Sequence, residues 1–164
     1  MSQPVSVVIR PAVAGDAEAI GRVFDAAVRA GWTYLGAAAQ QPMFDASDWD
    51  RLVADHAPPN VLLVAEDGAG RVVGFTAAHP ADGELFLLFV DPAQGRRGVG
   101  RMLLSAAHDA LRAAGCRQAY LYTHEQNERA LATYAAVGYR PDGTARESDF
   151  RGIPIRELRL TTQL

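Results

Sequence analysis

Residues 87–104, LLFVDPAQGRRGVGRMLL, decide the fold, because an apolar strand pattern runs through a short loop directly into an amphipathic helix. The first amide groups of a helix lack internal acceptors and carry partial positive charge, so this junction favours an anion. Three glycines leave those amides open, namely Gly95, Gly98 and Gly100. Three cationic side chains stand beside them, namely Arg96, Arg97 and Arg101. The stretch therefore predicts a pyrophosphate-binding loop.

Two common nucleotide-binding loops do not match this stretch. A Walker A loop needs a lysine, and all 16 basic residues of the chain are arginine. A dinucleotide-binding loop needs a third glycine, where this chain has Leu103. That loop also belongs to a βαβ unit near the start of a domain, whereas the sequence predicts hairpins before residue 87.

Hydrophobic periodicity and turn residues predict the element order β-α-α-β-β-β-α-β-α-β-β. The expected strands are 5–10, 61–66, 71–79, 84–90, 119–123, one that starts at Tyr139, and 155–160. The expected helices are 16–31, 47–55, 99–114 and one capped by Asn127, and the expected loops include 32–42 and 141–154. This order indicates a mixed α/β sheet rather than a doubly wound parallel sheet.

Two motifs in register resemble those of the GNAT (GCN5-related) N-acetyltransferase superfamily. Residues 90–100, VDPAQGRRGVG, followed by an amphipathic helix, are similar to the acetyl-CoA motif usually written [RQ]xxGx[GA]. The superfamily's second motif resembles a set of downstream residues: Asn127, Ala130, Tyr134, Gly138 and Tyr139. A helix and a strand separate the two motifs, and the predicted order matches the family from residue 5 to 162.

The resemblance implies an α/β (α+β) GNAT fold with a mixed, mostly antiparallel sheet of about seven strands and about four flanking helices. The sheet would splay at the acetyl-CoA site, and residues 1–164 would form a single domain. The strand before the loop would pair with the pantetheine arm like an added strand, and the loop would bind the pyrophosphate. The expected cofactor-binding residues are Leu88, Phe89, Val90, Gly95, Arg96, Arg97, Gly98, Val99, Gly100 and Asn127. Gly95 stands where the family usually has Arg or Gln.

Direct acetyl transfer to an amine needs a proton donor for the leaving thiolate and a base for the amine. The resemblance places the donor at Tyr134 and the base at Glu84, with water as the alternative base. Tyr134 can equally be a core tyrosine of its helix, and Glu84 an exposed carboxylate after a turn. Asn127 can cap its helix, bind the cofactor, or do both.

Aromatic residues in two predicted loops indicate a partly apolar acceptor pocket, since family members build that pocket there. The candidates for substrate binding are Trp32, Tyr34 and Phe150. His124 follows a strand near Asn127, where it can contact the substrate or lie on the surface. The four histidines and Cys116 show no metal-ligand spacing, so no metal is expected.

The composition is that of an ordinary globular protein, with 49% hydrophobic and 21% charged residues. A net charge of -3 gives no reason to expect nucleic acid or a membrane as partner, and the Lys-free usage indicates a bacterial source. A single cysteine and no signal-peptide pattern predict a cytoplasmic location.

The chain is thus expected to be an acetyl-CoA-dependent N-acetyltransferase of a small-molecule or protein amine, and the resemblance implies a homodimer. Two alternatives are a non-catalytic acyl-CoA-binding module and an acyltransferase for a longer acyl-CoA.

Overall fold

The computed structural model describes residues 6–95 and 97–164. Its strands are β1 (Val8–Pro11), β2 (Val61–Glu66), β3 (Val72–His79), β4 (Glu84–Val90), β5 (Gln118–His124), β6 (Arg140–Phe150) and β7 (Ile153–Gln163). Its helices are α1 (Ala17–Gly31), α2 (Ala46–Asp55), α3 (Val99–Ala113) and α4 (Glu128–Ala136), with 3-10 turns η1 (Ala14–Asp16), η2 (Thr33–Gln40) and η3 (Pro92–Gln94). The order of strands and α-helices is the one predicted from the sequence.

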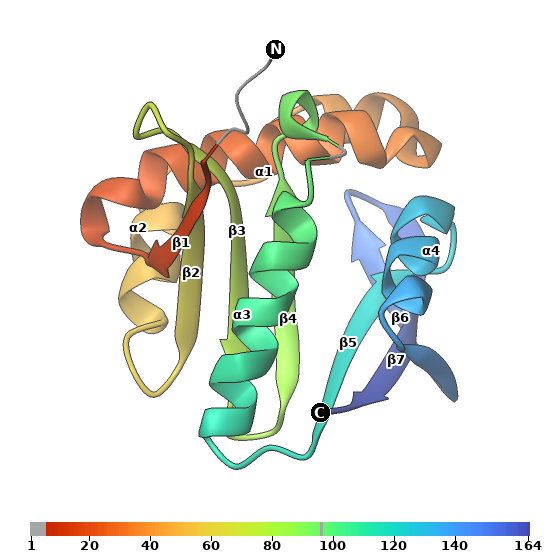
Figure 1. The fold of residues 1–164 in the computed structure, drawn as a ribbon. Helices are drawn as coiled ribbons and strands as arrows, with labels where there is room; N and C mark the ends of the chain where they lie inside the picture. Colours follow the sequence, from red (N-terminus) through yellow and green to blue (C-terminus); the bar gives the residue numbers. More distant parts are fainter. Residues whose placement is uncertain (1–5, 96) are drawn as a thin grey trace.

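The strands form one mixed sheet in the order β1-β2-β3-β4-β5-β7-β6. Every neighbouring pair is antiparallel except β4 and β5, which are parallel and joined by α3. Helices α1 and α2 pack on one face of the sheet, and α3 and α4 lie on the other (Figure 1). This architecture confirms the predicted fold class, a mixed and mostly antiparallel sheet flanked by helices.

The sheet opens between β4 and β5. Among the described residues these two strands pair only at Glu84 and Tyr120, and beyond that position they diverge (Figure 1). The pairing of β3 with β4 shifts register so that Leu87 faces Ala77 and Leu85 faces Ala78, which leaves Phe86 as an extra residue. Such a bulge bends and twists its strand, so it turns the rest of β4 away from β5.

Two stretches predicted as loops have regular structure. The expectation for residues 141–154 was wrong, because they belong largely to the β6–β7 hairpin, which closes between Phe150 and Ile153. Both turn residues have positive φ, 52° at Arg151 and 83° at Gly152, as a two-residue hairpin turn requires. Arginine is an unusual residue at the first of these positions, so the sequence carries no clear turn signal. Residues 33–40, also expected to be irregular, form the 3-10 turns of η2 around a kink at Gly36.

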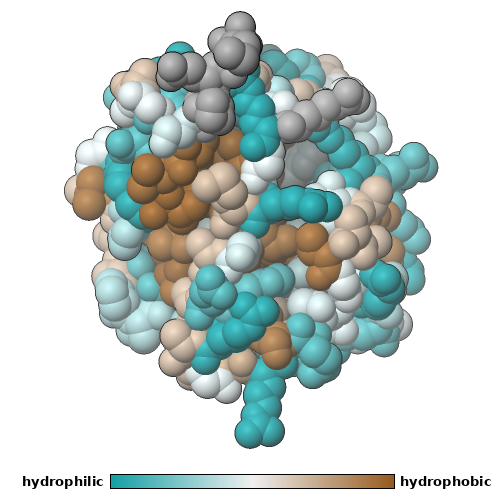
Figure 2. All heavy atoms as spheres, viewed as in Figure 1, coloured by the Kyte–Doolittle hydropathy of each residue, from teal (hydrophilic) through white to brown (hydrophobic). Residues whose placement is uncertain are grey.

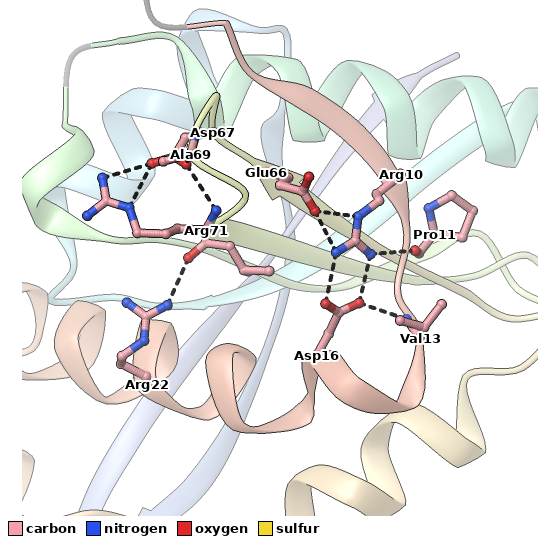
Figure 3. A network of polar contacts seen from close by, with 10 residues as sticks. Arg10, Pro11, Val13, Asp16, Arg22, Glu66, Asp67, Ala69 and Arg71 are labelled. Atoms are coloured by element: carbon pink, nitrogen blue, oxygen red, sulfur yellow. Dashed lines mark hydrogen bonds and ion pairs between the residues drawn. The ribbon is translucent and has the colours of Figure 1, made fainter.

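A polar network fixes the start of α1 to the edge of the sheet (Figure 3). The guanidinium of Arg10 contacts the carboxylates of Asp16, at 2.8 Å, and Glu66, at 2.7 Å. Asp16 also accepts a hydrogen bond from the amide of Val13. The hydrogen bond from Arg10 holds the pKa of the buried Asp16 carboxyl below its usual range. The network therefore joins β1, η1 and β2 far from the splay.

The surface mixes polar and apolar side chains (Figure 2). Large apolar residues exposed on it include Val8 of β1 and Met102 of α3. Within the described part of the chain, no helix is both long and apolar enough to cross a membrane.

We predict that Gly74→Ala destabilises the protein by about 1–3 kcal/mol, because overpacking forces neighbours to shift. A Cβ on Gly74 would lie 2.9 Å from Leu103 Cδ1 and 3.2 Å from both the Phe89 carbonyl and Val99 Cγ1. Urea unfolding measures the effect. The control is Gly31→Ala at the end of α1, where an added Cβ meets nothing within 4 Å. Equal stability of Gly74→Ala and the wild type would show that α3 is free to move off the sheet.

Candidate active site

The amino end of α3 presents free backbone donors. Gly98 caps the helix with a φ of 77°, a left-handed conformation that favours glycine. Met102 donates the first helical hydrogen bond, to the Gly98 carbonyl at 3.0 Å. The amides of residues 99–101 therefore lack helical acceptors, and no acidic residue stands in the first turn. This end of α3 can bind an anion such as a pyrophosphate.

The free edge of β4 lies beside that helix end. The Thr76 hydroxyl donates to the Leu87 carbonyl at 2.7 Å, and the amide of Asp91 donates to the Val73 carbonyl at 2.9 Å, so the backbone groups of residues 87 and 91 face β3. Because backbone groups alternate along a strand, those of Leu88 and Val90 face the opening toward β5. An extended ligand can pair with them as an added strand. Phe89, the third predicted residue, pairs with Phe75 of β3.

A first cavity of about 220 Å³ joins these two features. Its wall contains residues of β4, the loop, α3 and α4, including Leu88, Phe89, Val90, Gly95, Gly100, Asn127 and Tyr134. The structure thus brings most of the predicted cofactor-binding residues around one hollow. Acetyl-CoA fits this arrangement, because the backbone of β4 suits its amide-containing arm and the α3 terminus suits its phosphates.

Of the other predicted cofactor residues, Val99 and Arg97 do not line this cavity. Val99 is buried against Val73 and Leu103, so only its backbone is available to a ligand. Arg97 is exposed and donates to Gln94 at 3.3 Å. Arg96 lies outside the described residues. Asn127 caps α4 by accepting from the amide of Ala130 at 3.1 Å, and its side chain also lines the cavity.

Sequence reasoning missed Arg129, which lies on α4 and lines the same cavity. One of its Nη atoms is 3.8 Å from where a Cβ on Gly95 would stand. This cation therefore reaches the loop position that carries Arg or Gln in the resembling family. Its position two residues after Asn127 was the only signal in the sequence.

A second cavity of about 290 Å³ lies on the β5 side of the opening. One wall is apolar and contains Phe24, Trp32, Met43 and Phe44. The other wall carries polar groups: Glu84, Tyr122, His124, Arg146 and Glu157. Both cavities share six lining residues, namely Trp32, Leu88, Phe89, Asn127, Ala130 and Tyr134. We call these six the junction residues.

Tyr134 is the junction residue with an ionisable group. Among residues 6–95 and 97–164, its hydroxyl has no hydrogen-bond partner, and its ring packs edge-on against Tyr139 at 5.6 Å. Burial raises the pKa of Tyr134 above its usual value, so the hydroxyl is protonated at neutral pH. A protonated hydroxyl at this position can donate to a group that lies in either cavity.

Glu84 lies at the closed end of the opening, where β4 still pairs with β5. Its carboxylate is 3.5 Å from the Tyr120 hydroxyl and 3.7 Å from His79 Nδ1. The carboxylate lines the second cavity but not the first.

The three residues predicted to bind substrate occupy three different places. Trp32 lines both cavities. Tyr34 lines neither cavity, but its hydroxyl is 2.6 Å from Nδ1 of His124, which lines the second cavity. Phe150 is buried in the core and packs edge-on against Trp32 at 5.7 Å. In the described part of the chain, no cluster of three potential metal ligands occurs.

Comparison with known proteins agrees with this geometry. The model of the acetyltransferase (GNAT) family matches residues 25–139, which is more than half of the chain. The chain belongs to the GNAT family. This confirms the family predicted from the two motifs, and acetyl-CoA is the acyl donor of GNAT acetyltransferases.

The chain is similar to individual relatives and to solved structures of this family. It is 37% identical over 93 residues to the mycothiol acetyltransferase of Clavibacter michiganensis, covering 56% of this chain and 30% of that protein. The chain spans about a third of the length of the curated relatives it matches first. A GCN5-related N-acetyltransferase structure from Rhodopseudomonas palustris has a TM-score of 0.79 at 23% identity, covering 100% and 98% of the two chains. YncA of Salmonella typhimurium, solved with its cofactor acetyl-CoA, has a TM-score of 0.76 at 20% identity, with 97% and 94% covered.

We predict that acetyl-CoA at about 100 times its Kd stabilises the protein by about 2.7 kcal/mol, a rise in Tm of roughly 5–10 °C. Gly98→Asp should abolish the rise, because it places a negative charge at the α3 terminus. Gly98→Asn is the matched control, since both residues tolerate the left-handed conformation and only one is charged. Thermal unfolding with and without ligand measures both. An unchanged rise in Gly98→Asp would place the pyrophosphate elsewhere.

Proposed function

We propose that this chain is a single GNAT domain that transfers acetyl from acetyl-CoA directly to a primary amine. One observation carries the proposal: Tyr134 lies where the first and second cavities meet, and its protonated hydroxyl has no hydrogen-bond partner within residues 6–95 and 97–164. The first cavity has the backbone donors for the cofactor, and the second is a separate space for an acceptor. Both substrates can therefore be bound together, which supports transfer in a ternary complex without a covalent enzyme intermediate.

In this mechanism the chain holds two substrates and moves protons between them. Acetyl-CoA supplies an activated acetyl thioester. The free amides at the start of α3, with Arg129 nearby, hold the phosphates, and Leu88 and Val90 orient the arm. Tyr134 acts as general acid and protonates the leaving sulfur. Its raised pKa keeps the proton in place until negative charge develops nearby.

The acceptor amine must lose a proton before it can attack, because an alkylamine with a pKa near 10 is charged at neutral pH. The sequence predicts that Glu84 is this base, acting directly or through water. Its position at the closed end of the opening favours the route through water.

The second cavity also bears on the acceptor. Its apolar wall of Phe24, Trp32, Met43 and Phe44 supports an amine attached to an apolar body. Phe44 remains 43% exposed, so the wall continues to the surface and can accommodate either a small molecule or a protein segment.

We predict that Tyr134→Phe lowers kcat about 10²–10⁴-fold and leaves the acetyl-CoA-induced rise in Tm unchanged, because only the proton donor is lost. Release of thiol from acetyl-CoA with a panel of primary amines measures turnover. Tyr139→Phe is the control, since this neighbouring hydroxyl bonds His108 at 2.7 Å and lines neither cavity. Full turnover in Tyr134→Phe would remove the tyrosine from the mechanism.

A further inference from the structure

Three neighbouring strands place a histidine, a glutamate and an arginine in one row across the β5 side of the second cavity. Glu157 of β7 is the register partner of His124 on β5 and of Arg146 on β6. Arg146 Nε lies 2.5 Å from Glu157 Oε2, and its guanidinium stacks 3.7 Å above the Tyr122 ring. His124 and Glu157 are only 12% and 15% exposed, and both line the cavity. The row is therefore a preorganised polar wall opposite the apolar one.

The His124 ring is fixed from two sides. Its Nδ1 lies 2.6 Å from the Tyr34 hydroxyl, and its ring packs 4.4 Å from the junction residue Trp32. Its Nε2 lies 3.8 Å from Glu157 Oε1, which is too far for a direct hydrogen bond. With its proton on Nδ1 and donated to Tyr34, the neutral ring would keep a lone pair on Nε2. That lone pair and a carboxylate oxygen then lie side by side.

We propose that His124 Nε2 and Glu157 together bind the ammonium group of the acceptor, and that His124 takes its proton. The proposal rests on the acetyl-transfer function above. An ammonium donates hydrogen bonds and carries charge, so two acceptors 3.8 Å apart, one of them anionic, suit it. Tyr34 and Glu157 are positioning residues, since they fix the ring and stabilise its charged form.

The proposed step conserves protons and electrons. The ammonium N–H bond breaks, its proton moves to Nε2, and the electron pair stays on nitrogen. That pair forms the C–N bond to the acetyl carbon while the C–S pair leaves with sulfur, which takes the Tyr134 proton. The amide nitrogen loses its second proton to the Tyr134 oxygen, and His124 returns its proton to solvent. The net change is one amide, one thiol and one released proton.

The resting charge of His124 agrees with this role. Burial lowers the pKa of His124 below its usual 6.5, against a smaller opposing effect of the Glu157 carboxylate. The groups that face the imidazole are Tyr34 from η2, Glu157 from β7 and, through Glu157, Arg146 from β6. The ring is thus neutral at neutral pH and able to accept a proton.

His124 contacts a junction residue, whereas Glu84 lies at the closed end of the opening. Glu84 pairs with Tyr120, and His124 lies four residues further along β5, about 13 Å away along the strand. His124 touches the junction residue Trp32, whereas the polar contacts of Glu84 are at the closed end. In this step His124 contacts the ammonium directly, and Glu84 takes no proton.

The experiment compares two probe amines, benzylamine, which is charged at neutral pH, and aniline, which is not. His124→Gln should lower kcat/KM for benzylamine about 10²–10⁴-fold and change that for aniline by only a few-fold. Glu157→Gln should shift the acid limb of the pH profile of kcat/KM for benzylamine to lower pH, because it removes the carboxylate that raises the pKa of His124. Unchanged benzylamine turnover in His124→Gln, or an equal loss with both amines, would overturn the proposal.

The matched control is His108→Gln. His108 is also half-buried beside a tyrosine hydroxyl, at 2.7 Å, and burial also lowers its pKa, but it lines neither cavity. His108→Gln should leave the acid limb of the benzylamine kcat/KM profile at the same pH as in the wild type. Every variant is first tested for the acetyl-CoA-induced rise in Tm. Absence of that rise in the wild type would instead defeat the proposed function.

A second readout needs no turnover. In the coenzyme A complex of protein labelled with ¹⁵N-histidine, the ring nitrogens of His124 are followed as the pH varies, with His124→Gln as the assignment control. We expect a neutral ring at pH of about 7 with the proton on Nδ1, since the ordinary histidine pKa is about 6.5 and burial lowers it. A charged ring at this pH, or a neutral ring protonated on Nε2, would overturn the proposal.

Discussion

The separation of β4 from β5 is the constraint on which the rest of the site depends. The strands start in close contact, with the Tyr120 amide donating to the Gly83 carbonyl at 3.0 Å. A Cβ on Gly83 would lie 2.7 Å from the Gln118 carbonyl, so only glycine permits this approach. The bulge at Phe86 then turns β4 away. Backbone groups that a continuous sheet would pair are left for a ligand.

Because the sheet opens, helices on its α3 and α4 face can contribute to one space. The terminus of α3 gives donors for an anion, and α4 gives Asn127, Arg129 and Tyr134. Close packing of α3 on Gly74 fixes the height of its terminus above β4. The proposed cofactor site is thus built mainly from backbone, so it needs few specific side chains.

The proposed acceptor site is built differently, from side chains on the β5 arm. His124, Glu157 and Arg146 occupy one row because β5, β7 and β6 are in register there. The tight turn at Arg151 helps to hold this arm against η2, since the Arg151 guanidinium donates to the carbonyls of Ala38 and Pro42. Tyr34 and Trp32 reach His124 from that same region of the chain.

The sequence by itself determined the features that are local in the chain. Residues 87–104 specified strand, loop and helix, and Asn127 specified a cap, because periodicity and capping are written within a few residues. The tertiary structure alone decided the pairs that meet through space. Tyr34 and His124 are 90 residues apart, and Arg129 meets the loop of Gly95 across the opening. Such pairs leave no spacing signal, since only the register of the strands and the packing of the helices bring them together.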